Sequence, residues 1–284
     1  MRSTSSLRSA RLVVFALGIG CAPALARAQD KPEGVPKVEP AAADSKKEET
    51  KAEAPKAPAP APVAAPAGSA VVPEPRPGAW IRQHEAFLER GRRGEVDLLF
   101  LGDSITAGWN GAGAIWSRYY APRKAANFGI GGDRTQHVLW RLDNGEVDAI
   151  RPKVVVLMIG TNNIGRNAED EVAEGVKAVV DRVRSKLPDA KVLLLGVFPR
   201  GSNRDKTVPT VGPDPRVARI NARLAAFDDG RAVRYLDIGV AFLDDAGQVS
   251  RAIMPDFLHL NRKGYQLWAD AIEPRLWEMM AETP

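Results

Sequence analysis

The chain has 284 residues, of which 44% are hydrophobic and 26% are charged. This ordinary balance excludes a chain that is disordered throughout and a bundle of membrane helices. The formal net charge of +5 comes largely from four arginines in residues 1–28, where no acidic residue occurs. Without them the basic and acidic residues nearly balance, so nucleic acid is not an expected partner. The single cysteine, Cys21, excludes a disulfide framework and a cysteine-ligated metal cluster.

Residues 1–28 have the pattern of an export signal. Arginines precede a short apolar run, residues 12–19, and small residues precede a cleavage point after Ala28. The run is far shorter than the ~20 apolar residues that span a bilayer, so no transmembrane segment is expected. We expect residues 1–28 to be a signal peptide and the protein to be periplasmic or extracellular. An uncleaved tail is one alternative. A lipid anchor on Cys21 is another, less favoured because Gly18 stands where such signals usually carry Leu.

Residues 29–78 have the composition of a linker. They contain 11 of the 22 prolines and no aromatic residue. Such a segment cannot bury enough apolar surface to offset the entropy lost on ordering, so we expect a disordered spacer rich in Pro, Ala, Lys and Glu. All six tryptophans lie between Trp80 and Trp277. We therefore expect one folded domain over residues 79–284.

Strand and helix signals alternate along this domain. Five short apolar runs, several rich in β-branched residues, predict strands over residues 96–101, 125–128, 154–159, 192–198 and 233–236. Apolar residues at helical spacing predict helices over residues 172–183 and 217–227, and a last helix begins near Tyr265. This alternation predicts an α/β fold, with a parallel sheet covered by helices on both faces.

Polar residues gather in four loops of this predicted sheet. They are residues 102–105, 129–133 and 160–163, each directly after a strand, and residues 256–259, before the last helix. In parallel sheets, sites form at the carboxyl ends of the strands, so the loops should meet at one edge.

The residue types in these loops suit acyl transfer. Ser104 is a weak nucleophile unless a base takes its proton, and His259 suits that task. Asp256, three residues earlier, can orient the imidazole and stabilise its charged form. The charge that develops on a carbonyl oxygen needs preset donors, which the N–H groups of Ser104 and Gly132 and the side-chain amide of Asn162 could supply.

Each residue also has a simpler interpretation. Gly-Asp-Ser and Asn-Asn are common turn sequences, and Asp256 could cap the last helix. Of the other histidines, His84 lies in a charged, surface-like segment and His137 on a predicted helix, where packing is the expected role. A nucleotide-binding loop after the second strand would need a third glycine, but Arg134 stands there. The four loops together favour catalysis over any of these interpretations.

The four loops resemble the conserved blocks of the SGNH (GDSL-type) hydrolases, and residues 127–133, 135–142 and 150–153 resemble the catalytic subunits of intracellular platelet-activating-factor acetylhydrolases. The resemblance implies a flavodoxin-like three-layer α/β/α sandwich with a five-stranded parallel sheet. It also implies a serine ester hydrolase without metal or cofactor, and it allows a homodimer. Its nucleophile would be Ser104, its base His259 and its orienting acid Asp256. The oxyanion donors would be Ser104, Gly132 and Asn162.

The resemblance further implies a tight acyl pocket, for which Ile105, Thr161 and Leu258 are the candidate residues. The expected reaction is removal of short acyl groups, acetyl above all, through an acyl-Ser104 intermediate. Those acetylhydrolases are intracellular, whereas this chain carries an export signal. Exported relatives of the wider family often deacetylate carbohydrates, so the expected substrate is an acetylated carbohydrate or an acetyl-phospholipid. The alternative is a non-catalytic exported module that binds a glycan on the same fold.

Overall fold

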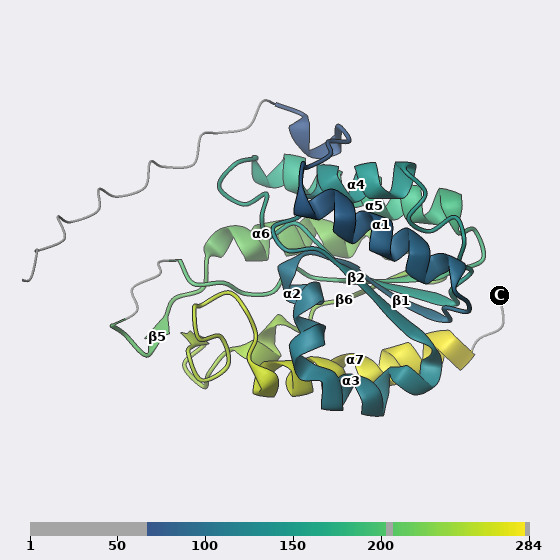
Figure 1. The fold of residues 1–284 in the computed structure, drawn as a ribbon. Helices are drawn as coiled ribbons and strands as arrows, with labels where there is room; N and C mark the ends of the chain where they lie inside the picture. The colour runs from purple at the N-terminus through teal and green to yellow at the C-terminus, as the bar shows by residue number, and fades with distance from the viewer. Residues whose placement is uncertain (1–66, 203–206, 282–284) are drawn as a thin grey trace, which may run out of the picture. The chain divides into compact units, whose positions relative to one another are not determined.

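The computed structural model describes residues 67–202 and 207–281. The expected signal peptide, its Cys21 alternative and most of the expected linker lie outside the described residues, so these expectations stay predictions. Figure 1 shows the central sheet between two layers of helices. Within the described residues, no helix is both long enough and apolar enough to cross a membrane.

The central sheet has five parallel strands in the order β2-β1-β3-β4-β6. This is the flavodoxin-like order, and it confirms the predicted fold class. Each strand of this sheet begins and ends within three residues of a predicted strand. The strands are β1 (Leu98–Gly102), β2 (Ala125–Gly129), β3 (Val154–Met158), β4 (Lys191–Leu195) and β6 (Val233–Leu236), with an antiparallel pair, β5 (Thr210–Val211) and β7 (Val249–Ser250), outside the sheet.

Helices cover both faces of the sheet (Figure 1). On one face lie α1 (Ala79–Arg92), α4 (Thr135–Asp143), α5 (Glu169–Lys186) and α6 (Pro215–Leu224), and on the other lie α3 (Gly113–Tyr119) and α7 (Arg262–Ala281). The short α2 (Ser104–Ala107) follows β1, and short 3₁₀ helices are η1 (Ser69–Val71), η2 (Gly108–Ala112), η3 (Ala121–Arg123), η4 (Ala225–Phe227) and η5 (Gly239–Phe242).

Alternate residues of each strand enter different apolar cores. Leu99 and Leu101 of β1 belong to the core under α4, α5 and α6, whereas Leu98 and Phe100 belong to the core under α3 and α7. All four side chains are fully buried. A strand buried on both faces must be apolar throughout, which is why these runs could be recognised in the sequence.

The domain begins earlier than the composition indicates. Residues 68–78, which we call the N-terminal arm, were expected to belong to the disordered linker, but here they pack on α4 and α5. Ala70 is fully buried, and its carbonyl oxygen accepts a hydrogen bond from Thr135 Oγ1 at 2.7 Å. The backbone N–H of Gly68 donates to Glu171 at 2.7 Å. Proline-rich composition did not prevent ordering, because the folded domain supplies the partners that the arm lacks by itself.

Candidate active site

Ser104 lies at the carboxyl end of β1, where α2 begins. The backbone at Gly102 is closely surrounded, because a Cβ there would come within 2.3 Å of both the Met158 carbonyl oxygen on β3 and Thr106 Oγ1 on α2. Asp103 caps α2 by accepting a hydrogen bond from the backbone N–H of Ile105 at 2.9 Å. Burial raises the pKa of Asp103 to about 7 against the effect of that hydrogen bond. Ser104 itself is only partly buried.

The Ser104 hydroxyl meets an imidazole from the far end of the chain. Ser104 Oγ lies 2.9 Å from His259 Nε2, and His259 Nδ1 lies 2.7 Å from Asp256 Oδ2. The other carboxylate oxygen of Asp256 accepts from the backbone N–H groups of Leu258 and His259. Asp256 therefore orients the histidine and does not cap α7, which begins six residues later.

The electrostatics of the pair determine which ring nitrogen carries the hydrogen. Burial raises the pKa of Asp256, but hydrogen bonds from the backbone and ring of His259 outweigh burial and leave that pKa below its usual value. Because an ionised carboxylate only accepts hydrogen bonds, Nδ1 of His259 donates to it. Nε2 is then left with its lone pair toward the Ser104 hydroxyl, as a general base requires.

The loop after β2 passes beside Ser104. The backbone N–H of Asp133 donates to the carbonyl oxygen of Ile130 at 3.2 Å, and Gly132 between them has a φ of 78°. These are the features of a type II turn, whose third residue favours glycine. A Cβ on Gly131 would lie 4.0 Å from that of Ser104, so this turn is next to the nucleophile.

The loop after β3 reaches the same place. Asn162 Nδ2 donates one hydrogen bond to the Asp133 carbonyl oxygen at 2.9 Å, and the amide carries a second hydrogen. The next residue, Asn163, is fully buried and ties this loop to the start of α4, accepting from the Thr135 N–H and donating to the side chains of Thr135 and Gln136. The structure thus brings all five residues of the expected triad and oxyanion site to one edge of the sheet.

A buried charged cluster lies beneath these loops, and sequence analysis gave its members no role. Asp133, Arg141 and Glu146 are at most 1% exposed, and Arg141 forms ion pairs with both acids. Arg141 also donates to the backbone carbonyl oxygens of Phe128 and Gly102. The signal that could have found this cluster is an arginine on the apolar face of a predicted helix, followed five residues later by a glutamate.

The remaining expected residues are buried beside the site. Ile105 and Leu258 belong to the apolar core under α3 and α7, and Thr161 accepts hydrogen bonds from Arg200. The acyl pocket assigned to them stays a prediction. His84, expected on the surface, is instead buried on α1 with an exposed fraction of 3%, and its ring packs against tryptophans.

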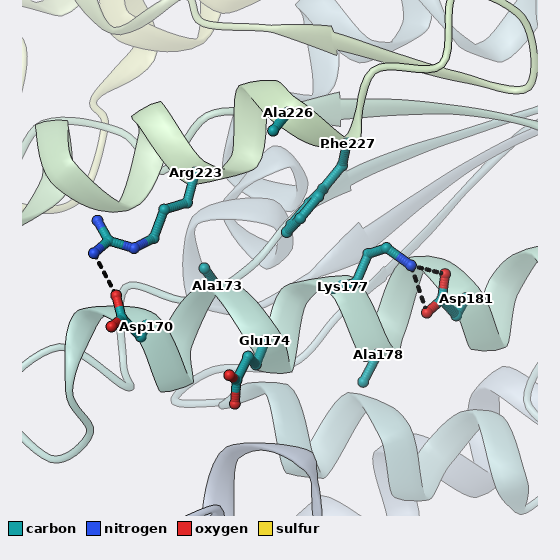
Figure 2. Close-up of a pocket in the computed structure, with 9 residues that line it drawn as sticks. All are labelled: Asp170, Ala173, Glu174, Lys177, Ala178, Asp181, Arg223, Ala226 and Phe227. Atoms are coloured by element: carbon teal, nitrogen blue, oxygen red, sulfur yellow. Dashed lines mark hydrogen bonds and ion pairs between the residues drawn. The ribbon is translucent and has the colours of Figure 1, made fainter.

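Figure 2 shows a pocket between α5 and α6 that shares no residue with this site. Four of its charged side chains form ion pairs, Arg223 with Asp170 and Lys177 with Asp181. Neither a nucleophile with a base nor an unpaired buried donor lines it. It is therefore a weaker candidate for chemistry than the edge at Ser104.

A serine, a histidine and an aspartate linked at the carboxyl edge of a five-stranded parallel sheet are typical of a hydrolase of the flavodoxin-like class. The model of the GDSL-like lipase/acylhydrolase family matches residues 100–267. This chain belongs to that family, whose activity is carboxylic ester hydrolysis.

Relatives of known sequence agree with this assignment, and a solved structure shares the fold. The human platelet-activating factor acetylhydrolase IB subunit alpha1 is 39% identical over 205 residues, covering 72% of this chain and 86% of the relative. The rat subunit alpha2 is 38% identical over 209 residues, with the same coverage. A GDSL-like lipase from Bacteroides thetaiotaomicron shares the fold with a TM-score of 0.56 at 18% identity, covering 69% of this chain and 97% of that structure.

Proposed function

We propose that the protein is a serine esterase that removes short acyl groups, acetyl above all, with Ser104 as nucleophile. The observation that carries the proposal is the continuous hydrogen-bonded chain from Ser104 through His259 to Asp256, with distances of 2.9 and 2.7 Å. Hydroxyl, imidazole and carboxylate stand in the order that nucleophilic catalysis needs.

In the first step, Ser104 Oγ attacks the ester carbonyl carbon as its proton passes to His259 Nε2. The carbonyl oxygen becomes an oxyanion, which the N–H groups of Ser104 and Gly132 and the second amide hydrogen of Asn162 stabilise. The tetrahedral intermediate then collapses. The C–O bond to the alcohol breaks, the alcohol takes the proton from His259, and an acyl-Ser104 ester remains.

In the second step, water replaces the alcohol. His259 Nε2 takes a proton from water as the hydroxide oxygen attacks the acyl carbon, and the same donors hold the oxyanion. Collapse breaks the bond to Ser104 Oγ, which recovers its proton from His259. Asp256 stays ionised throughout and stabilises the imidazolium that forms twice in each turnover.

We also propose that the physiological substrate is an acetyl ester of a carbohydrate or a phospholipid, hydrolysed outside the cytoplasm. The curated relatives are named acetylhydrolases, which supports a small acyl group. The arginine-led apolar segment at the N-terminus supports export. The bulky neighbours Ile105, Thr161 and Leu258 would limit the acyl group.

Covalent labelling separates the esterase from the alternative, a glycan-binding module. A fluorophosphonate probe should label the wild-type protein on Ser104 and leave Ser104→Ala unlabelled. If the wild type were not labelled and hydrolysed no acetyl ester, the proposed esterase function would be contradicted.

The acyl preference is tested separately. Equal kcat/KM for acetyl and octanoyl p-nitrophenyl esters would refute the small acyl pocket. A panel of acetylated xylan, acetylated sialic acid and acetyl-phospholipid then identifies the substrate class.

A further inference from the structure

Arg76, from the N-terminal arm, contacts the turn beside the nucleophile. Its Nη1 donates to the Gly131 carbonyl oxygen at 2.8 Å and to Asp133 Oδ1 at 3.0 Å. The guanidinium also lies against Gly132, because a Cβ there would come within 3.3 Å of Nη2. Arg76 thus touches three consecutive residues of the loop that carries a proposed oxyanion donor.

The contact to Gly131 determines where the Gly132 N–H points. The carbonyl of Gly131 and the N–H of Gly132 belong to one planar peptide unit, in which they point in opposite directions. A hydrogen bond that fixes the carbonyl therefore fixes the N–H. This peptide needs such a restraint, because both of its residues are glycines, and glycine adopts positive and negative φ almost equally well.

The arm is held firmly enough to act as that restraint. Its hydrogen bonds include the buried one from Thr135 of α4 to Ala70 and one from the Glu74 N–H to the carbonyl oxygen of Gln136 at 3.1 Å. Asn167 Nδ2, in the loop before α5, donates to Ser69 Oγ at 2.9 Å. The Arg76 side chain itself is 35% exposed. Small cations in solution can therefore reach the place that its guanidinium occupies.

We infer that Arg76 is a positioning residue, which holds the Gly131–Gly132 peptide in the orientation that aims the Gly132 N–H at the oxyanion. The inference rests on the proposed esterase function for its kinetic consequence only. A purely structural role is the competing explanation, since Arg76 also pairs with the buried Asp133. Trp80 offers the matched control, because its Nε1 donates to the same Asp133 Oδ1 at 2.7 Å.

The kinetic test compares Arg76→Ala, Arg76→Lys and Trp80→Phe on p-nitrophenyl acetate. Loss of one oxyanion donor typically lowers kcat by about 10²–10³-fold. Because a misaimed donor is lost only part of the time, Arg76→Ala should lower kcat by roughly 10–10²-fold, with KM within about threefold. Arg76→Lys keeps a hydrogen-bond donor, so its kcat should lie between those of the wild type and Arg76→Ala. Methylguanidinium at millimolar concentration should raise the kcat of Arg76→Ala and leave the wild type unchanged.

Trp80→Phe separates the two explanations. It removes a hydrogen bond to Asp133 without touching the Gly131 carbonyl, so its kcat should stay within about threefold of wild type. An Arg76→Ala variant with wild-type kcat would overturn the inference. So would equal losses in Arg76→Ala and Trp80→Phe without rescue by methylguanidinium, because the effect would then come from the pairing of Asp133.

A second measurement needs no activity. In protein labelled with ¹⁵N-glycine, the Gly132 amide should give one sharp resonance in the wild type. In Arg76→Ala it should broaden or double as the peptide samples two orientations, while Trp80→Phe leaves it single. An unchanged Gly132 resonance in Arg76→Ala would overturn the inference even if the wild type hydrolysed no ester. Conversely, a changed resonance with an inactive wild type would contradict only the proposed function.

Discussion

The two halves of the site are held in different ways. The half that contains Ser104, His259 and Asp256 is joined by direct side-chain hydrogen bonds across two loops. The half that contains Gly132 presents backbone, and its loop is contacted by Arg76 at Gly131 and by the buried Arg141 at Asp133. A change in the first half should remove chemistry and spare the fold. A change in the second half should alter the orientation of the oxyanion donors or the stability of the fold, and should lower activity less.

The largest expected effect is the loss of the nucleophile. Ser104→Ala should lower kcat for p-nitrophenyl acetate by at least about 10³-fold, because the remaining groups can only polarise the ester. The thermal unfolding midpoint should stay within a few degrees of wild type, since the hydroxyl is only partly buried and its partner His259 is 44% exposed. Steady-state kinetics and calorimetry on the same preparation check both. Retained activity would place the reactive centre elsewhere.

Asn162 belongs to the half that contains Gly132 and is itself a proposed donor, so its removal should have an intermediate effect. Asn162→Ala deletes a proposed oxyanion donor and also the hydrogen bond to the Asp133 carbonyl oxygen. We expect kcat to fall by about 10²–10³-fold with little change in KM. Fluorophosphonate labelling of Ser104 should slow but still occur. A KM-only effect would instead assign Asn162 to substrate binding.

The two halves of the site also differ in how much of them could be predicted from the sequence. The strands and the Asp256–His259 pair could be predicted because their signals are local: apolar runs buried on both faces, and a carboxylate three residues from an imidazole. The contact between Arg76 and Gly131 could not be predicted, because the two residues are 55 apart in the sequence and Arg76 lies in an arm with the composition of a disordered spacer. The surroundings of Arg141 left one signal, an arginine on the apolar face of a predicted helix with a glutamate five residues later, and it does not indicate which other acid Arg141 pairs with.

Truncation tests whether the N-terminal arm belongs to the oxyanion half. A chain that begins at residue 67 keeps the arm, whereas one that begins at residue 79 loses Arg76 and the anchor at Ala70. We expect the longer chain to match the full-length kcat and the shorter one to lose roughly 10–10²-fold, as Arg76→Ala does. Comparing the shorter chain with Arg76→Ala in the longer one isolates the guanidinium. Equal kcat in the two truncated chains would confine the site to residues after 78.

The smallest expected effect is on stability, and it concerns the charged cluster under the oxyanion half. Burial raises the pKa of Glu146 to about 7, although the ion pair with Arg141 opposes this. Asp133 and Asp103 are buried too and also interact with Arg141, so Arg141 is shared among several acids. Between the ordinary glutamate pKa of 4.5 and about 7, the folded protein therefore keeps a proton that the unfolded chain releases.

The sign of the effect follows from that proton. The stability that Glu146 contributes is fully present below pH 4.5 and is lost as the pH rises through about 7. Glu146→Gln does not titrate, so its free energy of unfolding relative to wild type should rise by roughly 1 kcal/mol per pH unit in this window and level off above it. Urea unfolding at pH 5, 6, 7 and 8 measures the difference. Glu169→Gln is the control, because a hydrogen bond from Arg219 lowers the pKa of the partly buried Glu169, so its difference from wild type should be flat between pH 5 and 8. A flat difference for Glu146→Gln would mean that Arg141 keeps this carboxylate ionised, and the oxyanion half would then rest on fixed rather than titrating charge.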